Sequence, residues 1–205
     1  VISNFRSGGS IDNEAWARFF QATYDVTEQL HFTAGLRYTD EEKKFLPDQV
    51  ILVNKFAGSG HPVLDAPFMQ AGEPILPHVE KAESIDEVTP MVNVSYDWNE
   101  DLMVYVSYSE GFKSGGFSQR VFPPIVAGYT APAGTPDIDL IPTFDPEYVE
   151  VYEFGFKYAT PGQRLRLNGA LFTTKYDDLQ VQVFTSVAPV TKNAASATID
   201  GFELE

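Results

Sequence analysis

The side chains that could bind a metal are few and far apart. The three histidines are scattered over the first half of the chain, at His31, His61 and His78, and they share no spacing that is typical of a metal site. The chain contains no cysteine, so it can form neither a disulfide framework nor a thiolate metal site. We therefore predict that the chain has no metal site and needs no cofactor.

Two loop motifs have the composition of a binding site but lack its spacing. Asp137, Asp139 and Asp145 could offer oxygen ligands to calcium, but they do not follow the pattern of a known calcium loop. Residues 111–117 are rich in glycine, yet they lack the spacing of a P-loop and open no predicted helix. The sequence also has no nucleophile elbow, no His-Glu-x-x-His motif and no recognisable triad. We therefore predict no catalytic residue, and that the protein is not an enzyme.

Composition excludes several other classes of protein. The net charge is −15, with 29 acidic and 14 basic residues, whereas nucleic-acid binding needs a basic surface. The same charge disfavours a peripheral helix held on anionic lipid. No stretch reaches the roughly 18 consecutive apolar residues that a membrane-spanning helix needs. The aromatic share of 14% favours strands and membrane interfaces.

Strict alternation of apolar and polar residues is the main structural signal. It is clearest at 30–39, 88–97 and 102–109, where Leu, Val, Phe and Tyr occupy every second position. A period of two predicts strands with one apolar and one polar face. Further strands are predicted at 15–24, 150–158 and 164–176, and a seventh is predicted to begin near Ile199.

Short and long connections alternate between these strands. Short turns are predicted at 25–29, 97–101 and 159–163, and long loops at about 40–87, about 110–147 and, shorter, about 185–197. Long loops are uncommon inside compact soluble domains, whereas transmembrane barrels have short periplasmic turns and long extracellular loops. Aromatic residues also flank both ends of the strands: Tyr24, Trp98 and Tyr158 beside the turns, and Tyr38, Tyr108 and Phe112 beside the loops.

The predicted fold is therefore all-β, made of antiparallel strands of a transmembrane β-barrel in an outer membrane. Two girdles of aromatic side chains at two lipid–water interfaces explain the aromatic positions. A soluble β-sandwich that binds carbohydrate would explain the alternation equally well. It would not explain the unequal loops together with the girdles.

Several strings resemble the barrel of TonB-dependent outer-membrane receptors. They are YVSYSEGFKSGGF at 105–117, FDPEYVEVYEFGFK at 144–157, NGALFTTKYDDLQ at 168–180, NAASATIDGFELE at 193–205 and, earlier, residues 30–39. The resemblance implies a 22-stranded barrel whose lumen is closed by a plug domain. It also implies that residues 1–205 are about seven strands of that barrel, with the plug outside this stretch. Such receptors of Gram-negative bacteria take up scarce nutrients, typically iron–siderophore complexes, with energy supplied through TonB.

The predicted barrel has two sets of candidate functional residues, one on its strands and one in its loops. The polar face of the strands would face the lumen, with Arg37, Asn93, Ser95, Asp97, Glu153, Lys157, Arg166 and Asn168. Arg37 and Arg166 could form a charge ladder with Glu153 and Glu203. The long loops would contact the ligand through His61, His78, Phe122, Tyr129 and Phe144. The expected partners are membrane lipid, the plug, TonB and a small molecule such as a siderophore, but no nucleic acid. A passive porin remains an alternative.

Overall fold

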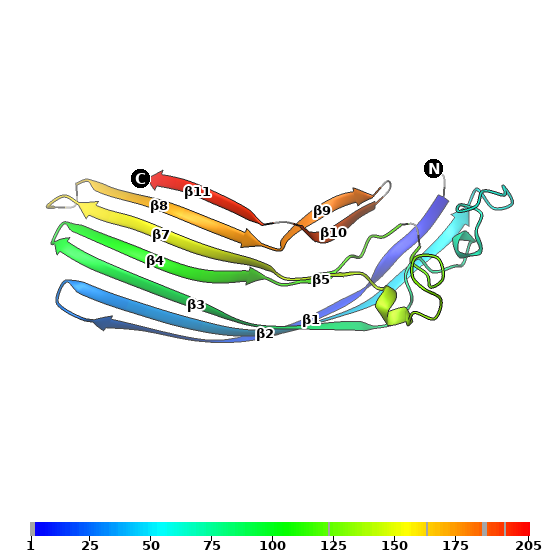
Figure 1. Cartoon of the computed structure of the whole chain (residues 1–205), viewed down its shortest axis with the longest axis horizontal. Helices are drawn as coiled ribbons and strands as arrows, with labels where there is room; N and C mark the ends of the chain where they lie inside the picture. The colour runs from blue at the N-terminus through cyan, green and yellow to red at the C-terminus, as the bar shows by residue number, and fades with distance from the viewer. Residues whose placement is uncertain (1–2, 123, 163, 186–187, 195) are drawn as a thin grey trace.

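The alternating sequence forms one antiparallel sheet of seven strands in a computed structural model (Figure 1), which describes residues 3–122, 124–162, 164–185, 188–194 and 196–205. The strands are β1 (Ser3–Asp25), β2 (Leu30–Asn54), β3 (Lys81–Asn99), β4 (Leu102–Lys113), β7 (Glu147–Ala159), β8 (Arg166–Asp177) and β11 (Ala197–Leu204). They lie in this order across the sheet, and each pairs antiparallel with the next. The prediction of about seven antiparallel strands is confirmed.

The three short turns lie at one end of the sheet, which we call the short-turn end. In the first turn the Thr27 hydroxyl oxygen accepts the backbone N–H of Leu30 at 2.9 Å. In the second, the side-chain oxygen of Asn99 accepts the backbone N–H of Leu102, also at 2.9 Å. Polar side chains that bond to the backbone in this way stabilise tight turns. The third turn follows β7 as predicted, although Gln163 lies outside the described residues.

The first long loop is shorter than predicted because the strands on both sides of it continue. The loop expected at about 40–87 covers only residues 55–80, since β2 runs to Asn54 and β3 begins at Lys81. Likewise, β1 begins at Ser3 rather than at Ala15. The charged run at 40–44 suggested a loop, but ion pairs such as Lys44–Glu42, at 2.6 Å, allow a strand to continue through water. These residues are charged because water surrounds this part of β2, and the backbone remains a strand.

The third predicted loop is also wrong in part, because most of it is a small hairpin. Strands β9 (Leu179–Thr185) and β10 (Ala188–Ala194) pair antiparallel between β8 and β11. In Figure 1 this hairpin continues beyond the ends of β8 and β11, on the side opposite the short turns, which we call the long-loop end. The second loop, residues 114–146, lies close to its predicted position. It contains the short strands β5 (Gly116–Phe117) and β6 (Thr143–Phe144) and the 3-10 helix η2 (Asp137–Leu140).

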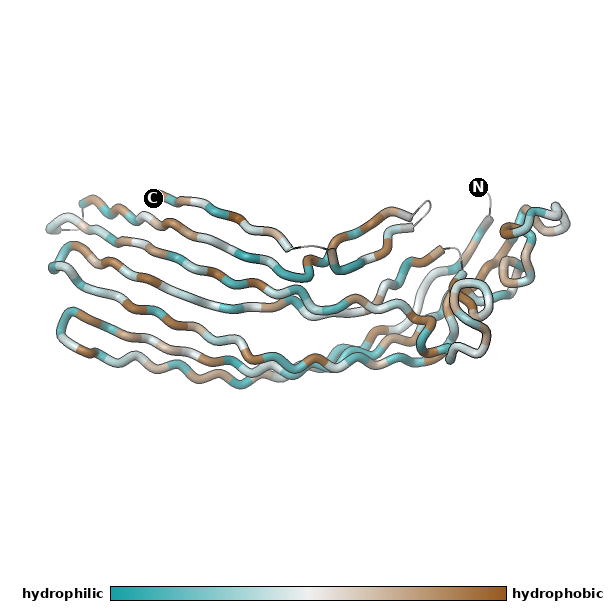
Figure 2. Tube along the Cα trace, in the orientation of Figure 1, coloured by the Kyte–Doolittle hydropathy of each residue, from teal (hydrophilic) through white to brown (hydrophobic). Residues whose placement is uncertain are grey.

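The two faces of the sheet differ in polarity, and the apolar face is the more exposed one. Val94 is 39% exposed, Phe154 50% and Leu171 60%, and all three lie on one face. On the opposite face Ser95 is only partly exposed and Gly155 is buried. Figure 2 shows the corresponding alternation of hydrophobic and hydrophilic residues along the strands. Among the described residues no helix is long and apolar enough to cross a membrane. An apolar face that is exposed on the outside of the sheet is stabilised by contact with lipid rather than with water.

The buried core lies outside this part of the sheet, at the long-loop end. Its eight members are Phe45, Ile51, Met69, Ile75, Leu76, Phe117, Val121 and Ile141. They come from the far part of β2 and from both long loops, of which the first contains the 3-10 helix η1 (Pro67–Met69). We call residues 41–80 and 114–146 the cap. The wall is the part of the seven-stranded sheet that carries the exposed apolar face. The chain thus has a folded unit at one end of a sheet whose apolar face is uncovered.

Candidate functional site

The cap is the candidate site because it joins segments that are distant in sequence. The backbone N–H of Ile125 in the second loop donates to the carbonyl of Ile75 in the first loop at 2.9 Å. The side-chain amide of Gln49 on β2 donates to the carbonyl of Gln119 at 2.6 Å. Together with the shared apolar core, these bonds fix the two long loops against β2. The loops therefore form a single ordered surface.

A buried carboxylate strengthens the junction between β2 and the second loop. Glu41 is 8% exposed, accepts a hydrogen bond from the Ser114 hydroxyl, and lies 3.2 Å from the Lys43 ammonium. Burial by itself would raise the pKa of Glu41, but the hydrogen bonds from Ser114 and Lys43 outweigh it and lower the pKa. The Lys43 ammonium also donates to the carbonyl of Gly115 at 2.8 Å. Glu41 is therefore charged at neutral pH and holds the beginning of the second loop.

One cavity of about 290 Å³ lies between β3 and the second loop. Phe144 on β6 is among its apolar lining residues, with Ile85 and Pro146, and Tyr148 on β7 also lines it. The Tyr148 hydroxyl donates to Glu87 at 2.5 Å. Four acidic residues are among the lining residues, namely Glu83, Asp86, Glu87 and Asp145. Asp86 projects from the face of β3 opposite to Glu83 and Glu87, and the Glu83 carboxylate lies 3.6 Å from the Lys81 ammonium. This cavity thus offers an aromatic surface in an acidic setting.

A second, more open hollow of about 460 Å³ is lined by an aromatic pair. The rings of Phe68 and Tyr129, one from each long loop, have their centroids 4.2 Å apart. Tyr129 remains 43% exposed. Tyrosine and phenylalanine surfaces of this kind can stack on a planar ligand.

The five predicted ligand residues do not gather at one place. Phe144 and Tyr129 line the two different cavities. The His61 ring nitrogen accepts a backbone N–H in its own turn, and the His78 ring bonds to a backbone carbonyl of β2. Phe122 packs on the cap core and stacks with Phe5, with 6.1 Å between the ring centroids. The sequence placed all five in loops, but it could not show that three of them hold the cap together.

The three aspartates that were weighed as possible calcium ligands, Asp137, Asp139 and Asp145, lie on different elements. Asp137 and Asp139 lie on η2, whereas Asp145 follows β6. No group of three possible ligands that could hold a metal ion occurs in the part of the chain that the structure describes. These aspartates were considered together only because they are close in sequence, and η2 and β6 place them on separate elements.

The eight residues that the sequence assigns to the lumen all lie on the same face of the wall. The register pairs Ser95 with Tyr105 and Lys157 with Asn168, and the alternation along each strand places the others beside them. The set is Arg37, Asn93, Ser95, Asp97, Glu153, Lys157, Arg166 and Asn168. This is the polar face, opposite the exposed apolar one.

On this polar face two members of the proposed charge ladder, Glu153 and Arg37, bond to neutral side chains. Glu153 accepts a hydrogen bond from the Tyr105 hydroxyl at 2.5 Å, and Arg37 donates to Thr39 at 3.1 Å. The Tyr105 ring lies directly over Gly155, where an added Cβ would come within 2.5 Å of it. The Lys157 ammonium lies 5.9 Å from the centre of the same ring. An aromatic ring over a glycine therefore organises this part of the wall.

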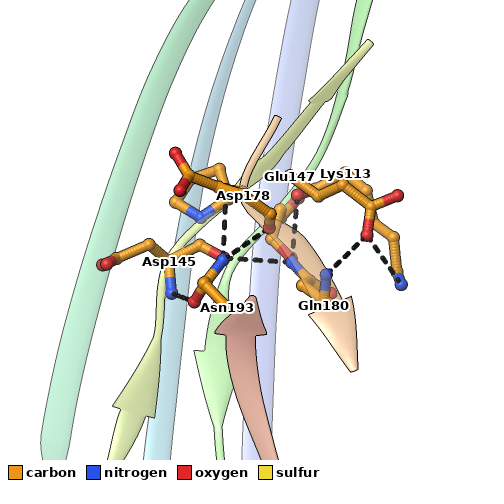
Figure 3. A network of polar contacts seen from close by, with 8 residues as sticks. Lys113, Asp145, Glu147, Asp178, Gln180 and Asn193 are labelled. Carbon is orange, nitrogen blue, oxygen red and sulfur yellow. Dashed lines mark hydrogen bonds and ion pairs between the residues drawn. The ribbon is translucent and has the colours of Figure 1, made fainter. Parts of the chain in front are cut away.

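Two amide side chains that sequence reasoning did not single out connect the hairpin β9–β10 to the cap (Figure 3). Gln180 and Asn193 are cross-strand partners in the hairpin, and both bond to the backbone of Asp145. In the sequence, Gln180 is the last residue of one string that resembles the receptor family and Asn193 is the first residue of another. Both are amides in the connection between two predicted strands, where polar side chains often bond to the backbone. Their common partner, Asp145, can be recognised only from the three-dimensional structure.

A wall with an exposed apolar face, short turns at one end and a folded cap at the other defines a transmembrane β-barrel segment. More narrowly, the chain belongs to the TonB-dependent receptor-like β-barrel family, whose model matches residues 2–205. We therefore expect the short turns to be periplasmic and the long loops extracellular, as is usual in outer-membrane barrels. The soluble β-sandwich is wrong as a fold, because a sandwich would bury the apolar face that is exposed here.

Solved structures of similar fold include proteins named as uptake, import and hemophore receptors. The ferric yersiniabactin uptake receptor FyuA from Yersinia pestis is 21% identical with a TM-score of 0.69, over 98% of this chain and 25% of its own. The ferric-catecholate import receptor Fiu from Escherichia coli K12 is 18% identical with a TM-score of 0.61, over 97% and 26%. The hemophore receptor HasR from Serratia marcescens, solved with its hemophore HasA and heme, is 17% identical with a TM-score of 0.56, over 94% and 31%. This chain thus spans about a quarter to a third of their lengths, and no curated protein matches it.

Proposed function

We propose that the protein is an outer-membrane receptor of a Gram-negative bacterium that imports an iron–siderophore complex by TonB-dependent active transport. The observation that carries the proposal is the folded cap, which places two cavities with aromatic linings at the extracellular end of a barrel wall. Two of the solved structures of similar fold are named as receptors for ferric yersiniabactin and ferric catecholates. The protein would act by binding and transport, without a catalytic step.

The residues of this chain would then have two tasks. Phe144 and Tyr129 would contact the cargo, while the polar face of the wall, including Asn93, Ser95 and Glu153, would line the path through the lumen. The plug and the segment that contacts TonB would lie outside these residues. After capture at the cap, TonB would rearrange the plug and open the path. Arg37 and Lys157, on the polar face, would contact the plug or water in that path.

The charge of the cavity at Phe144 narrows the class of cargo. Acidic residues outnumber basic ones among its lining residues: Glu83 is paired with Lys81 at 3.6 Å, but Glu87 and Asp145 lie there as well. Close like charges repel strongly where water is partly excluded. A highly anionic complex, such as a ferric tris-catecholate, would be disfavoured there. A neutral complex, such as a ferric tris-hydroxamate, would meet no such barrier. We therefore propose a neutral or cationic metal chelate as the cargo.

Uptake of labelled iron by the full-length receptor tests this function. The receptor would be expressed in a host without its own siderophore receptors and supplied with radioactive ferric hydroxamate, catecholate and mixed-ligand complexes, and with haem. The expected result is saturable uptake of a neutral complex that disappears in a matched strain without TonB. Uptake that is unsaturable and independent of TonB would show a passive porin instead. Uptake of the catecholate alone would overturn the charge argument.

A further inference from the structure

The hairpin β9–β10 carries two side chains that bond to the ends of the second loop (Figure 3). The Gln180 side-chain nitrogen lies 3.3 Å from the carbonyl oxygen of Lys113, 3.0 Å from that of Ser114 and 3.1 Å from that of Asp145. Lys113 is the last residue of β4 and Ser114 begins the loop, whereas Asp145 lies next to the end of the loop. A single amide therefore joins the two ends of the loop, more than thirty positions apart in the sequence.

Asn193, which pairs with Gln180 across the hairpin, adds a second set of bonds. Its side-chain nitrogen lies 2.9 Å from the carbonyl of Asp145, 3.4 Å from that of Pro146 and 2.8 Å from that of Asp178. Its side-chain oxygen accepts the backbone N–H of Asp145 at 2.7 Å. Asp145 is thus held on both its N–H and its C=O, which fixes the orientation of its peptide groups.

Two further contacts attach the same hairpin to neighbouring segments. The Ser118 hydroxyl donates to the carbonyl of Thr191 on β10 at 3.2 Å. The backbone N–H of Gln180 donates to the carboxylate of Glu147, the first residue of β7, at 2.8 Å. The hairpin therefore contacts the second loop at its start and its end, and the wall strand that follows it.

These bonds matter because the residues they fix form one side of the cavity at Phe144. Of the lining residues, Asp145 and Pro146 are bonded directly by the two amides. Gly115 follows Ser114 directly, and Phe144 precedes Asp145. The opposite side of the cavity belongs to β3 and does not depend on the hairpin. Displacement of the hairpin would thus change the shape of the cavity from one side only.

We propose that Gln180 and Asn193 are positioning residues that lock the second extracellular loop and the hairpin β9–β10 into one rigid arm, and so set the shape of the cavity that receives the cargo. The role of the cavity rests on the proposed function, whereas the locking of loop to hairpin does not. Neither amide needs to touch the cargo. Both act through the backbone of Asp145 and its neighbours.

Distances between spin labels test the locking without any cargo. This stretch contains no cysteine, so Asp139→Cys on η2 and Gln182→Cys on β9, both exposed, can be labelled selectively once any cysteine elsewhere in the full-length receptor is replaced. In the full-length receptor in lipid vesicles we expect one narrow distance distribution. Asn193→Asp, which keeps the size but replaces the donor, should broaden it, and the double variant with Gln180→Glu should broaden it further. Lys192→Ala, exposed and adjacent to Asn193, is the matched control and should leave it unchanged.

Transport kinetics test the consequence for the cavity. With a ferric tris-hydroxamate as the probe, Asn193→Asp should raise the KM of uptake by about tenfold with little change in maximal rate, as expected for the loss of one or two net hydrogen bonds. A general loss of folding would instead lower the maximal rate and the thermal stability of the barrel. A narrow distance distribution in both variants would overturn the proposal, as would an unchanged KM in a receptor that transports the probe. If the unaltered receptor takes up none of the complexes, the proposed function is wrong, and the spin-label distances alone decide whether the two amides lock the arm.

Discussion

The wall and the cap place their apolar residues on opposite faces, and a single strand shows both arrangements. In the first part of β2, Phe32 and Leu36 project from the apolar face and are 40% and 52% exposed. In its far part, Phe45 and Ile51 are 2% and 1% exposed. The pairing of β2 with β1 has no register shift between these points, so the two pairs lie on opposite faces of the same strand.

The switch shows where the surroundings of the strand change. Lipid surrounds the outer face of a barrel wall, so apolar side chains point outward there. Beyond the membrane both faces would meet water, and apolar side chains are stabilised only if other parts of the chain cover them. The two long loops provide this cover on the inner face of β2. The change occurs across the charged run at 40–44, so this run marks the boundary between lipid and water.

Removal of the Phe45 ring should produce the largest effect and should confine it to the cap. Phe45→Ala leaves a cavity in a core where the ring is packed against Phe117, and such truncations cost about 3–5 kcal/mol. We expect faster amide exchange throughout the two long loops but not in the wall. Leu52→Ala, at an exposed position of the same strand, is the control and should have little effect. Equal effects of the two substitutions would show that the cap has no real core.

A charge placed on either side of one wall strand should distinguish the two faces. Val94→Arg puts a cation on the lipid side and should destabilise the barrel by about 2–4 kcal/mol, whereas Ser95→Arg on the polar face should cost little. Unfolding of the full-length protein from lipid vesicles measures both. The reverse order would mean that the apolar face points into the lumen.

The wall was predictable from sequence because lipid imposes a simple rule on it. Alternation marked residues 88–97 and 102–109 as strands, and both lie within β3 and β4. The cap was not predictable in the same way, because its strands and loops obey no single period. The part of β2 around Ile51, where buried positions alternate with more exposed ones, was predicted to be loop because the charged residues before it ended the alternation in the sequence. Phe144 was predicted as a ligand residue from its place in a loop, but the cavity that it lines lies beside Asp145, which is bonded by Asn193 from far along the chain.

A side chain at Gly155 should weaken the wall by a moderate amount. The Tyr105 ring occupies the space over Gly155, so Gly155→Val would force the ring aside and break its bond to Glu153. Overpacking of this kind costs about 1–3 kcal/mol. The unfolding free energy in lipid measures the loss. In a Tyr105→Ala background the same substitution should cost much less, and a full loss there would mean that the ring is not the cause.

The smallest effect should come from acid, and it should appear in the cap alone. The Asp65 carboxylate accepts the backbone N–H groups of Gly58 and Gly60, each at 2.7 Å. These hydrogen bonds, first that of Gly60 and then that of Gly58, lower the pKa of Asp65 below its ordinary value of 3.8. A lowered pKa means that the folded loop binds the proton less well than the unfolded loop. The stabilisation is therefore complete above pH 3.8 and is lost as the pH falls through the lower, folded value.

Amide exchange at Gly58 and Gly60 can follow this loss. After correction for the intrinsic effect of pH on exchange, protection of these two N–H groups should fall in acid while protection in the wall stays constant. Asp65→Asn, which has no carboxylate to titrate, should show weaker protection at neutral pH and no further fall in acid. Because Asp65 is partly exposed and its carboxylate bonds to groups within the first long loop, the change should stay local to that loop. A loss of protection that spread through the cap core would instead place the acid-sensitive group among the buried carboxylates, with Glu41 as the first to examine by Glu41→Gln.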